Sequence, residues 1–224
     1  MQRWLRSLAA VALLLLPAPC WALTIHSSFG PGESFDSTTD IPVNFYTSPE
    51  IIGTSLAFAF DVPSGSDFVL DEVRMAASWA GTKKNAQFAI FSDTGGLPST
   101  TPLLLLADNP DALSTVPGIL SLPSPSSILL SAGQRYWLVI QPTSLDSSIP
   151  ADDFVELWLG LGATGVQTSR VSYDSGPWGD WFDSPFEAVA PAFSIEASPI
   201  PEPGTLVLMG VGLLLLRAAA SPGD

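Results

Sequence analysis

The chain has 224 residues, of which 46% are hydrophobic and 13% charged, so it is long and apolar enough to bury a core. Acidic residues outnumber basic ones by 22 to 8, and a net charge of −14 argues against nucleic acid as a partner, because phosphate would be repelled. A single Cys and a single His exclude an intrachain disulfide framework and leave little for imidazole or thiolate chemistry.

The first 22 residues have the organisation of a secretory signal peptide. Two arginines precede an apolar run at residues 8–16, and a segment containing small residues ends at Ala22. Nine apolar residues are too few to span a bilayer. The order of these regions predicts export, with cleavage between Ala22 and Leu23.

A lipoprotein signal is the alternative interpretation of the same segment, because Cys20 ends the apolar region. A lipobox requires a small residue immediately before the Cys, and Pro19 stands at that position. Cleavage after Ala22 would remove Cys20 together with the signal. The mature chain would then contain no thiol, which suits an oxidising compartment.

Residues 23–198 have a net charge of −15 and show the period-two alternation typical of half-buried strands. The alternation is clearest in four segments, at residues 73–79, 86–90, 135–141 and 155–159. Turn-forming residues separate these segments, for example at residues 63–65, 93–96, 117–118, 132–133 and 160–165. No segment shows a sustained helical period. The pattern predicts an all-β fold, a single β-sandwich or jelly-roll-like domain.

The C-terminal tail begins with a proline-rich segment that would end any preceding strand, since proline lacks a backbone donor. Pro201, Glu202 and Pro203 are followed by an apolar run that ends before Arg217. Residues 204–216 would form a helix of roughly 20 Å, against an apolar bilayer core of about 30 Å. The tail therefore predicts a short, marginal transmembrane helix. A proline-rich linker before an ordinary buried helix is the alternative.

Residues 199–224 resemble the PEP-CTERM sorting signal of Gram-negative bacteria, in which a Pro-Glu-Pro triplet and a short apolar helix precede a basic cluster. The resemblance implies a partner, an exosortase-like membrane protease or transpeptidase that cuts near the triplet. It also implies that the protein crosses the inner membrane and reaches the cell surface, outer envelope or extracellular matrix. Arg217 alone matches the basic cluster, because the chain continues as AAASPGD.

A second resemblance lies within the β domain. The segments AQFAIFSDTGGLP (residues 86–98) and LSAGQRYWLVI (residues 130–140) are similar to motifs of the bacterial choice-of-anchor R domains. The resemblance implies a β domain joined to one of several interchangeable surface anchors. The glycine pair permits positive φ in the turn after the first strand, and Tyr136 and Trp137 should face opposite sides of the second.

Residues suited to catalysis are scarce, and we expect neither a catalytic site nor a bound cofactor or metal. His26 lies four residues into the mature chain, where a solvated terminal residue is expected. Calcium is the one metal with plausible oxygen ligands, although no loop has the alternating acidic spacing of a strong site. The candidate ligand sets are Asp152 with Asp153, and Asp174 with Asp180 and Asp183.

Aromatic and acidic residues are densest between residues 173 and 183. Tyr173, Trp178 and Trp181 could stack on sugar rings, while Asp180 and Asp183 could accept hydrogen bonds from hydroxyl groups. The segment is thus a candidate ligand-binding loop for an extracellular polysaccharide. A hairpin whose rings pack over one end of the sandwich is the alternative.

Three functions remain open on the sequence. The first is a non-catalytic envelope or extracellular-matrix protein sorted to the surface. The second is a carbohydrate-binding β-sandwich module that uses the aromatic and acidic loop. The third is a glycan hydrolase with an unrecognised pair of carboxylates, since twenty acidic residues in residues 23–198 offer many pairs.

Overall fold

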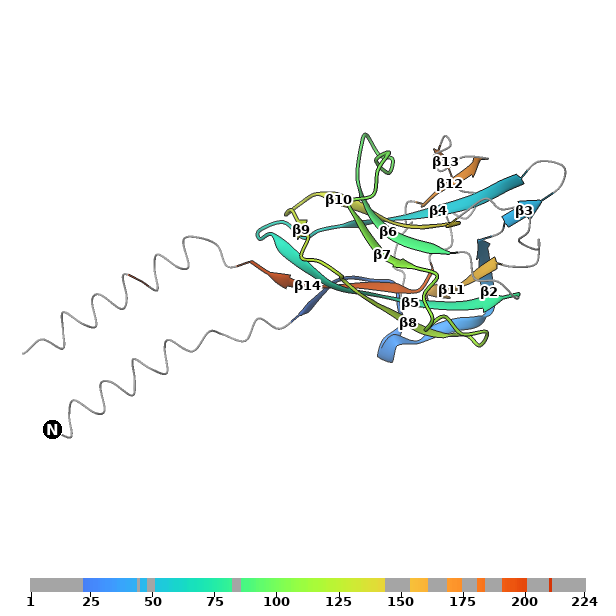
Figure 1. Cartoon of the computed structure of the whole chain (residues 1–224). Coiled ribbons are helices and arrows are strands. Elements are labelled where there is room, and N and C mark those ends of the chain that lie inside the picture. The colour runs from blue at the N-terminus through green and yellow to red at the C-terminus, as the bar shows by residue number, and fades with distance from the viewer. Residues whose placement is uncertain are drawn as a thin grey trace, which may run out of the picture.

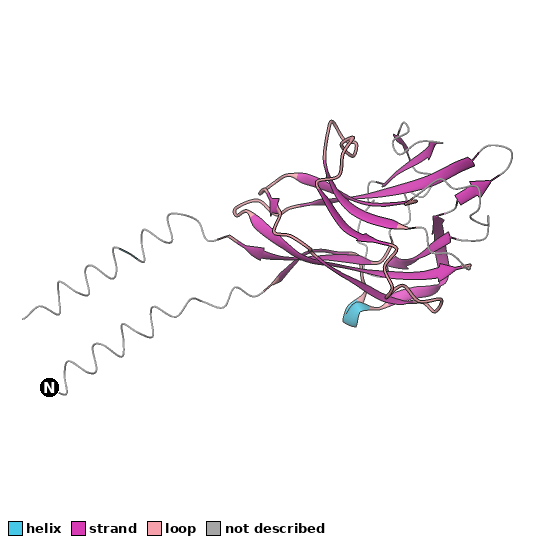
Figure 2. Cartoon of the chain, viewed as in Figure 1, coloured by secondary structure: helices cyan, strands magenta, loops and turns pink. Residues whose placement is uncertain are grey.

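The computed structural model of the chain describes residues 22–43, 45–47, 51–81, 86–143, 154–160, 169–174, 181–183, 191–200 and 210. Two antiparallel sheets face each other and form a β-sandwich (Figures 1 and 2). This arrangement confirms the predicted all-β fold with two packed layers. A short 3-10 turn, η1 (Pro31–Glu33), lies in the connection between the first two strands.

The first sheet is organised around its longest strand. Its members are β1 (Leu23–Ser27), β2 (Phe35–Val43), β5 (Phe68–Ala80), β8 (Gly118–Pro123), β9 (Leu129–Leu130), β11 (Phe154–Gly160) and β14 (Phe193–Pro199). On β5, Arg74 pairs with Ser194 of β14 on one side and with Ser121 of β8 on the other. β1 pairs with β14, and β2 pairs with β11. β8 and β1 therefore lie at opposite sides of this sheet.

The second sheet follows the order β13-β12-β4-β10-β6-β7, and β3 pairs with β4. The strands are β3 (Phe45–Thr47), β4 (Ile51–Asp61), β6 (Gln87–Ser92), β7 (Leu104–Asp108), β10 (Arg135–Gln141), β12 (Ser169–Asp174) and β13 (Trp181–Asp183). β4 and β6 flank β10, so the two segments that resemble choice-of-anchor motifs are adjacent in space. The turns predicted at residues 63–65, 93–96 and 132–133 are confirmed, and Gly95 and Gly96 have φ of 66° and 86°. Of the segment predicted as a turn at residues 160–165, Gly160 is the last residue of β11, and residues 161–165 lie outside the described residues.

The main core lies between the inner faces of the two sheets. The alternation in residues 73–79 is confirmed, because Val73, Met75, Ala77 and Trp79 are buried on the inner side of β5. Residues of the second sheet that face them include Phe58, Phe88 and Leu138. Tyr136 belongs to this core and Trp137 to another cluster, as expected for neighbours on one strand.

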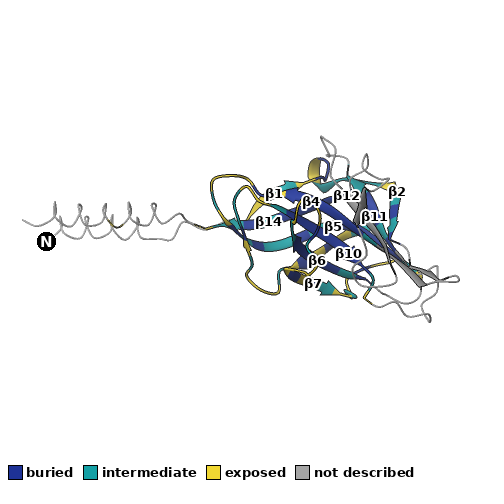
Figure 3. Cartoon of the chain, turned by 90° about the horizontal axis from the view of Figure 1, so that it is seen from above, coloured by how far each residue is buried: buried dark blue, intermediate teal, exposed yellow. Residues whose placement is uncertain are grey.

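The prediction of half-buried strands is wrong for the middle of the second sheet. The outer side of β4, β10 and β6 is also buried, as the dark blue ribbon of Figure 3 shows. The buried residues on this side are Ala57, Ala59, Ala89, Phe91, Trp137 and Val139. Both the inner-facing and the outer-facing positions of these strands are apolar. Continuous apolar runs of this kind are typical of strands that are buried on both sides.

Candidate functional site

The two terminal strands lie side by side and leave the domain at the same end (Figure 1). Leu23, the first residue of β1, pairs with Ala197 of β14. After β14, the backbone N–H of Ile200 donates a hydrogen bond of 2.8 Å to the carbonyl oxygen of Asp67. The described part of the chain is thus hydrogen-bonded up to the residue before Pro201. Ala22, on the other side of the predicted cleavage site, is exposed.

His26 is not the solvated terminal residue that the sequence suggests. It lies on β1, is partly buried, and stacks on Phe193 with ring centroids 4.6 Å apart. Its ring also lies 6.3 Å from that of Phe60. Burial lowers the pKa of His26 to about 4, although the nearby Asp61 carboxylate acts in the opposite direction. His26 is therefore a neutral side chain at the edge of the core.

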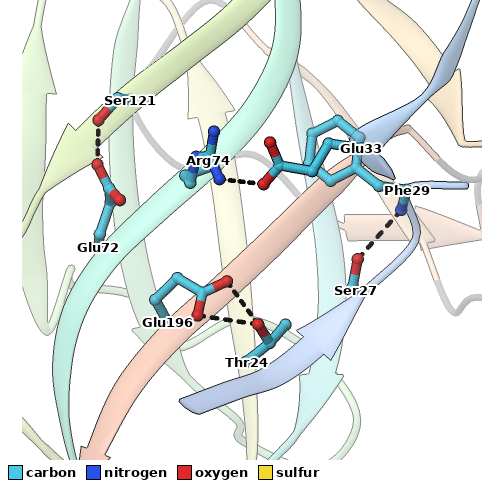
Figure 4. Close-up of polar contacts among 8 residues, drawn as sticks. All are labelled: Thr24, Ser27, Phe29, Glu33, Glu72, Arg74, Ser121 and Glu196. Atoms are coloured by element: carbon cyan, nitrogen blue, oxygen red, sulfur yellow. Dashed lines mark hydrogen bonds and ion pairs between the residues drawn. The ribbon is translucent and has the colours of Figure 1, made fainter. Parts of the chain in front are cut away.

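The outer face of the first sheet carries two glutamates in directly opposite positions, Glu72 on β5 and Glu196 on β14 (Figure 4). Like charges in such positions destabilise a sheet unless other groups engage them. The hydroxyl of Thr24 donates to Glu196 at 2.8 Å, and the hydroxyl of Ser121 donates to Glu72. Glu196 thereby connects β14 to β1, and Glu72 connects β5 to β8.

Each sheet also carries one ion pair among the described residues. Arg74 of β5 pairs with Glu33 of η1, and it is directed toward that turn (Figure 4). Arg135 of β10 donates two hydrogen bonds, of 2.8 and 3.0 Å, to Asp61 of β4. The Arg135 guanidinium lowers the pKa of Asp61. Both pairs are partly exposed, and such pairs contribute little to stability.

A side-chain hydrogen bond joins residues 86–98 and 130–140 in addition to the pairing of β6 with β10. The indole N–H of the fully buried Trp137 donates a hydrogen bond of 2.8 Å to Oδ1 of Asp93, and the N–H of Gly96 donates to Oδ2 at 3.1 Å. In the second motif, the Tyr136 hydroxyl accepts a bond from the N–H of Ser131. These hydrogen bonds hold turns against the strands of the second sheet.

We expect Asp93→Ala to lower the free energy of unfolding by about 1–3 kcal/mol, because it leaves the buried indole N–H of Trp137 without an acceptor. Chemical denaturation measures the change. Asp93→Asn keeps an oxygen for the indole and should cost less. Asp93→Ala should also cost less in a Trp137→Phe background, where the donor is already gone. Equal costs in both backgrounds would show that the contact has no stabilising role.

The candidate ligand-binding residues lie only in part among the described residues. β12 and β13 form an antiparallel pair at the edge of the second sheet, and their backbones carry Tyr173, Trp181 and Asp183. Trp181 pairs with Ser172, and Asp183 pairs with Arg170. Trp178 and Asp180 lie outside the described residues, as do Asp152 and Asp153 of the candidate calcium sets.

Within the described residues, no group of three or more His, Cys, Asp or Glu side chains is arranged to hold a metal ion. Pro201, Glu202, Pro203 and Arg217 of the predicted sorting signal lie outside those residues. The same part of the chain contains no helix with the length and apolarity needed to cross a membrane. No protein-family profile and no curated protein sequence matches the chain.

Proposed function

We propose that this protein is an exported, non-catalytic β-sandwich that is sorted to the cell surface or extracellular matrix of a Gram-negative bacterium. In this proposal the first 22 residues direct export, and an exosortase-like enzyme of the inner membrane recognises the tail at Pro201, Glu202 and Pro203. The domain between these signals acts by being displayed, and its acidic surface keeps it soluble.

The observation that carries the proposal is the pairing of β1 with β14. The strand β1 begins at Leu23, immediately after the predicted cleavage site, and β14 ends at Pro199, two residues before the triplet. Both predicted processing sites therefore flank a strand pair at one end of the sandwich. Cleavage at either site would leave the pairing of β1 with β14 intact, as a display domain requires.

Replacing Pro201, Glu202 and Pro203 with alanines is the direct test of sorting. We expect the full tail to remain on the chain and the protein to stay in the inner membrane, because the triplet would act by recognition. Cell fractionation and intact mass measure the result. The wild-type protein should be found outside the inner membrane with Leu23 as its first residue and a mass that lacks the tail.

A plain membrane anchor predicts a different outcome for the same variant. The triplet lies outside the apolar run, so its replacement would leave an anchored protein unchanged. Charges placed at Leu208 and Val211 would release that protein, since a charge at a helix centre costs about 2.5–3.5 kcal/mol on insertion. Wild-type protein found only as an uncut inner-membrane form, and indistinguishable from the triplet variant, would refute the sorting proposal.

Carbohydrate binding is the second candidate, favoured by the pairing of β12 with β13, which brings the backbone positions of Tyr173, Trp181 and Asp183 onto two neighbouring strands at the end of the second sheet. Binding of the exported protein to a panel of polysaccharides tests it. Loss of that binding in Trp178→Ala and Trp181→Ala, with the melting temperature unchanged, would establish a ligand-binding role in addition to display.

A further inference from the structure

The strand β1 has few side-chain anchors in the folded domain. Among the described strands it pairs with β14 alone, so it lies at the edge of the first sheet (Figure 1). Leu23, Thr24 and Ser27 are exposed, whereas Ile25 and His26 are partly buried. The pairing is also irregular, because its register shifts between Thr24 and His26. Two side chains, one of them His26, therefore hold this strand against the core.

The segment that follows β1 is attached much more firmly. Ser28 is buried, and its N–H donates a hydrogen bond of 2.9 Å to the carbonyl oxygen of Phe193. Its hydroxyl donates at 2.5 Å to the carbonyl oxygen of Pro191 and accepts at 2.9 Å from the N–H of Phe193. Phe29 is buried in one cluster with Trp158 on the outer side of the first sheet. A movement of β1 away from β14 would therefore stop at Ser28.

The contacts of His26 favour its neutral form. Its ring stacks on Phe193 with centroids 4.6 Å apart and is tilted against Phe60. Both neighbours are apolar core residues, so a charged imidazolium beside them would lose much of its hydration. This burial holds the pKa of His26 at about 4, below its ordinary value of 6.5. The ring can therefore keep its place at the core or bind a proton in water, and the two states compete.

The charged groups on the strands around His26 do not remove this competition. Each of β4, β10 and β14 contains one charged residue, namely Asp61, Arg135 and Glu196, and β1 contains none besides the histidine. Asp61 attracts the imidazolium, but burial has the larger effect, and the same carboxylate accepts two hydrogen bonds from Arg135. Glu196 is engaged by Thr24 on the outer face of the sheet (Figure 4).

We propose that β1 is an acid-sensitive strap: protonation of His26 releases residues 23–27 from β14, with Ser28 as the hinge and the rest of the sandwich still folded. Between pH 6.5 and 4 the released strap binds more protons than the closed one, so its population rises as the pH falls. Release leaves the edge of β14 unpaired and uncovers the ring of Phe193. The strap works whether or not the tail is a sorting signal.

Amide hydrogen exchange of the full chain, corrected for the intrinsic effect of pH on exchange, tests the proposal. We expect the protection of the paired amides of β1 to fall about a hundredfold between pH 7 and 4, as the two pKa values of His26 require. Release of β1 exposes little surface, so its exchange should not respond to denaturant below the unfolding transition. The amides of Ser28 and β5 should be more protected and should respond to denaturant.

His26→Phe is the matched variant, because phenylalanine can stack on Phe193 and does not titrate. In this variant the protection of β1 should stay within about threefold between pH 7 and 4, while its insensitivity to denaturant remains. The proposal is overturned if β1 and β5 exchange with the same protection and the same response to denaturant, or if the protection of β1 in the wild-type protein does not depend on pH. Equal pH dependence of β1 in both proteins would also overturn it. Should His26→Phe fail to fold, the wild-type comparison of β1 with β5 decides alone.

Discussion

Gly160→Ala will destabilise the domain by about 3 kcal/mol or more, a cost at the upper end of what overpacking causes. A Cβ atom on Gly160 would lie 2.1 Å from the carbonyl oxygen of Ser28 and 3.0 Å from its carbonyl carbon. The obstacle is backbone, which cannot move aside as a flexible side chain would. We expect a lower denaturation midpoint with an unchanged denaturant dependence.

The backbone of Ser28 cannot move away easily, because Ser28 is hydrogen-bonded to the segment that leads into β14. Its N–H donates to the carbonyl of Phe193 at 2.9 Å, and its hydroxyl donates to that of Pro191 at 2.5 Å. Gly118→Ala is the matched control, since its nearest contact would be an ordinary 3.8 Å to the carbonyl of Val116. That control should stay within about 0.5 kcal/mol of wild type. Equal effects of the two substitutions would contradict this account.

Acidification will destabilise the folded domain through His26 before most carboxylates protonate. The folded-state pKa is about 4, against an unfolded value of 6.5, so the unfolded chain binds more protons between these pH values. This contribution to stability is fully present above pH 6.5 and is lost as the pH falls toward 4. The largest loss, reached near and below pH 4, is about 3 kcal/mol.

His26→Phe should flatten the pH dependence between 6.5 and 4, because phenylalanine can stack on Phe193 and does not titrate. Denaturation at several pH values measures the slope for both proteins. Asp61, whose pKa is lowered by Arg135, loses its contribution only at lower pH, as it protonates below its ordinary range. An unchanged slope in His26→Phe would show that this histidine is not the group responsible.

Alternation predicted the fold well wherever one side of a strand is polar. On β5, Arg74 and Ser78 mark the outer side, and the apolar residues between them are in the core. On β10 the same reasoning failed, because Trp137 and Val139 are as deeply buried as Leu138. A strand with apolar residues on both sides has no period from which its orientation can be inferred.

The side-chain contacts described above depend on how strands distant in the sequence pair with one another. That register cannot be inferred from a single sequence. Asp93 and Trp137 are 44 residues apart and meet because β6 and β10 pair with Tyr136 opposite Ser92. His26 was expected to be solvated from its position near the mature terminus, but pairing of β1 with β14 brings it onto Phe193.

The position of β14 between β1 and β5 has a mechanical consequence. β14 runs toward the end of the domain from which the tail continues, so tension on the tail pulls the strand lengthwise. Its hydrogen bonds to both neighbours would then share the load in shear. Tension between Leu23 and Pro199 would instead separate β1 from β14 one bond at a time. A domain tethered through its C-terminal end alone should therefore withstand flow better than one pulled by both ends.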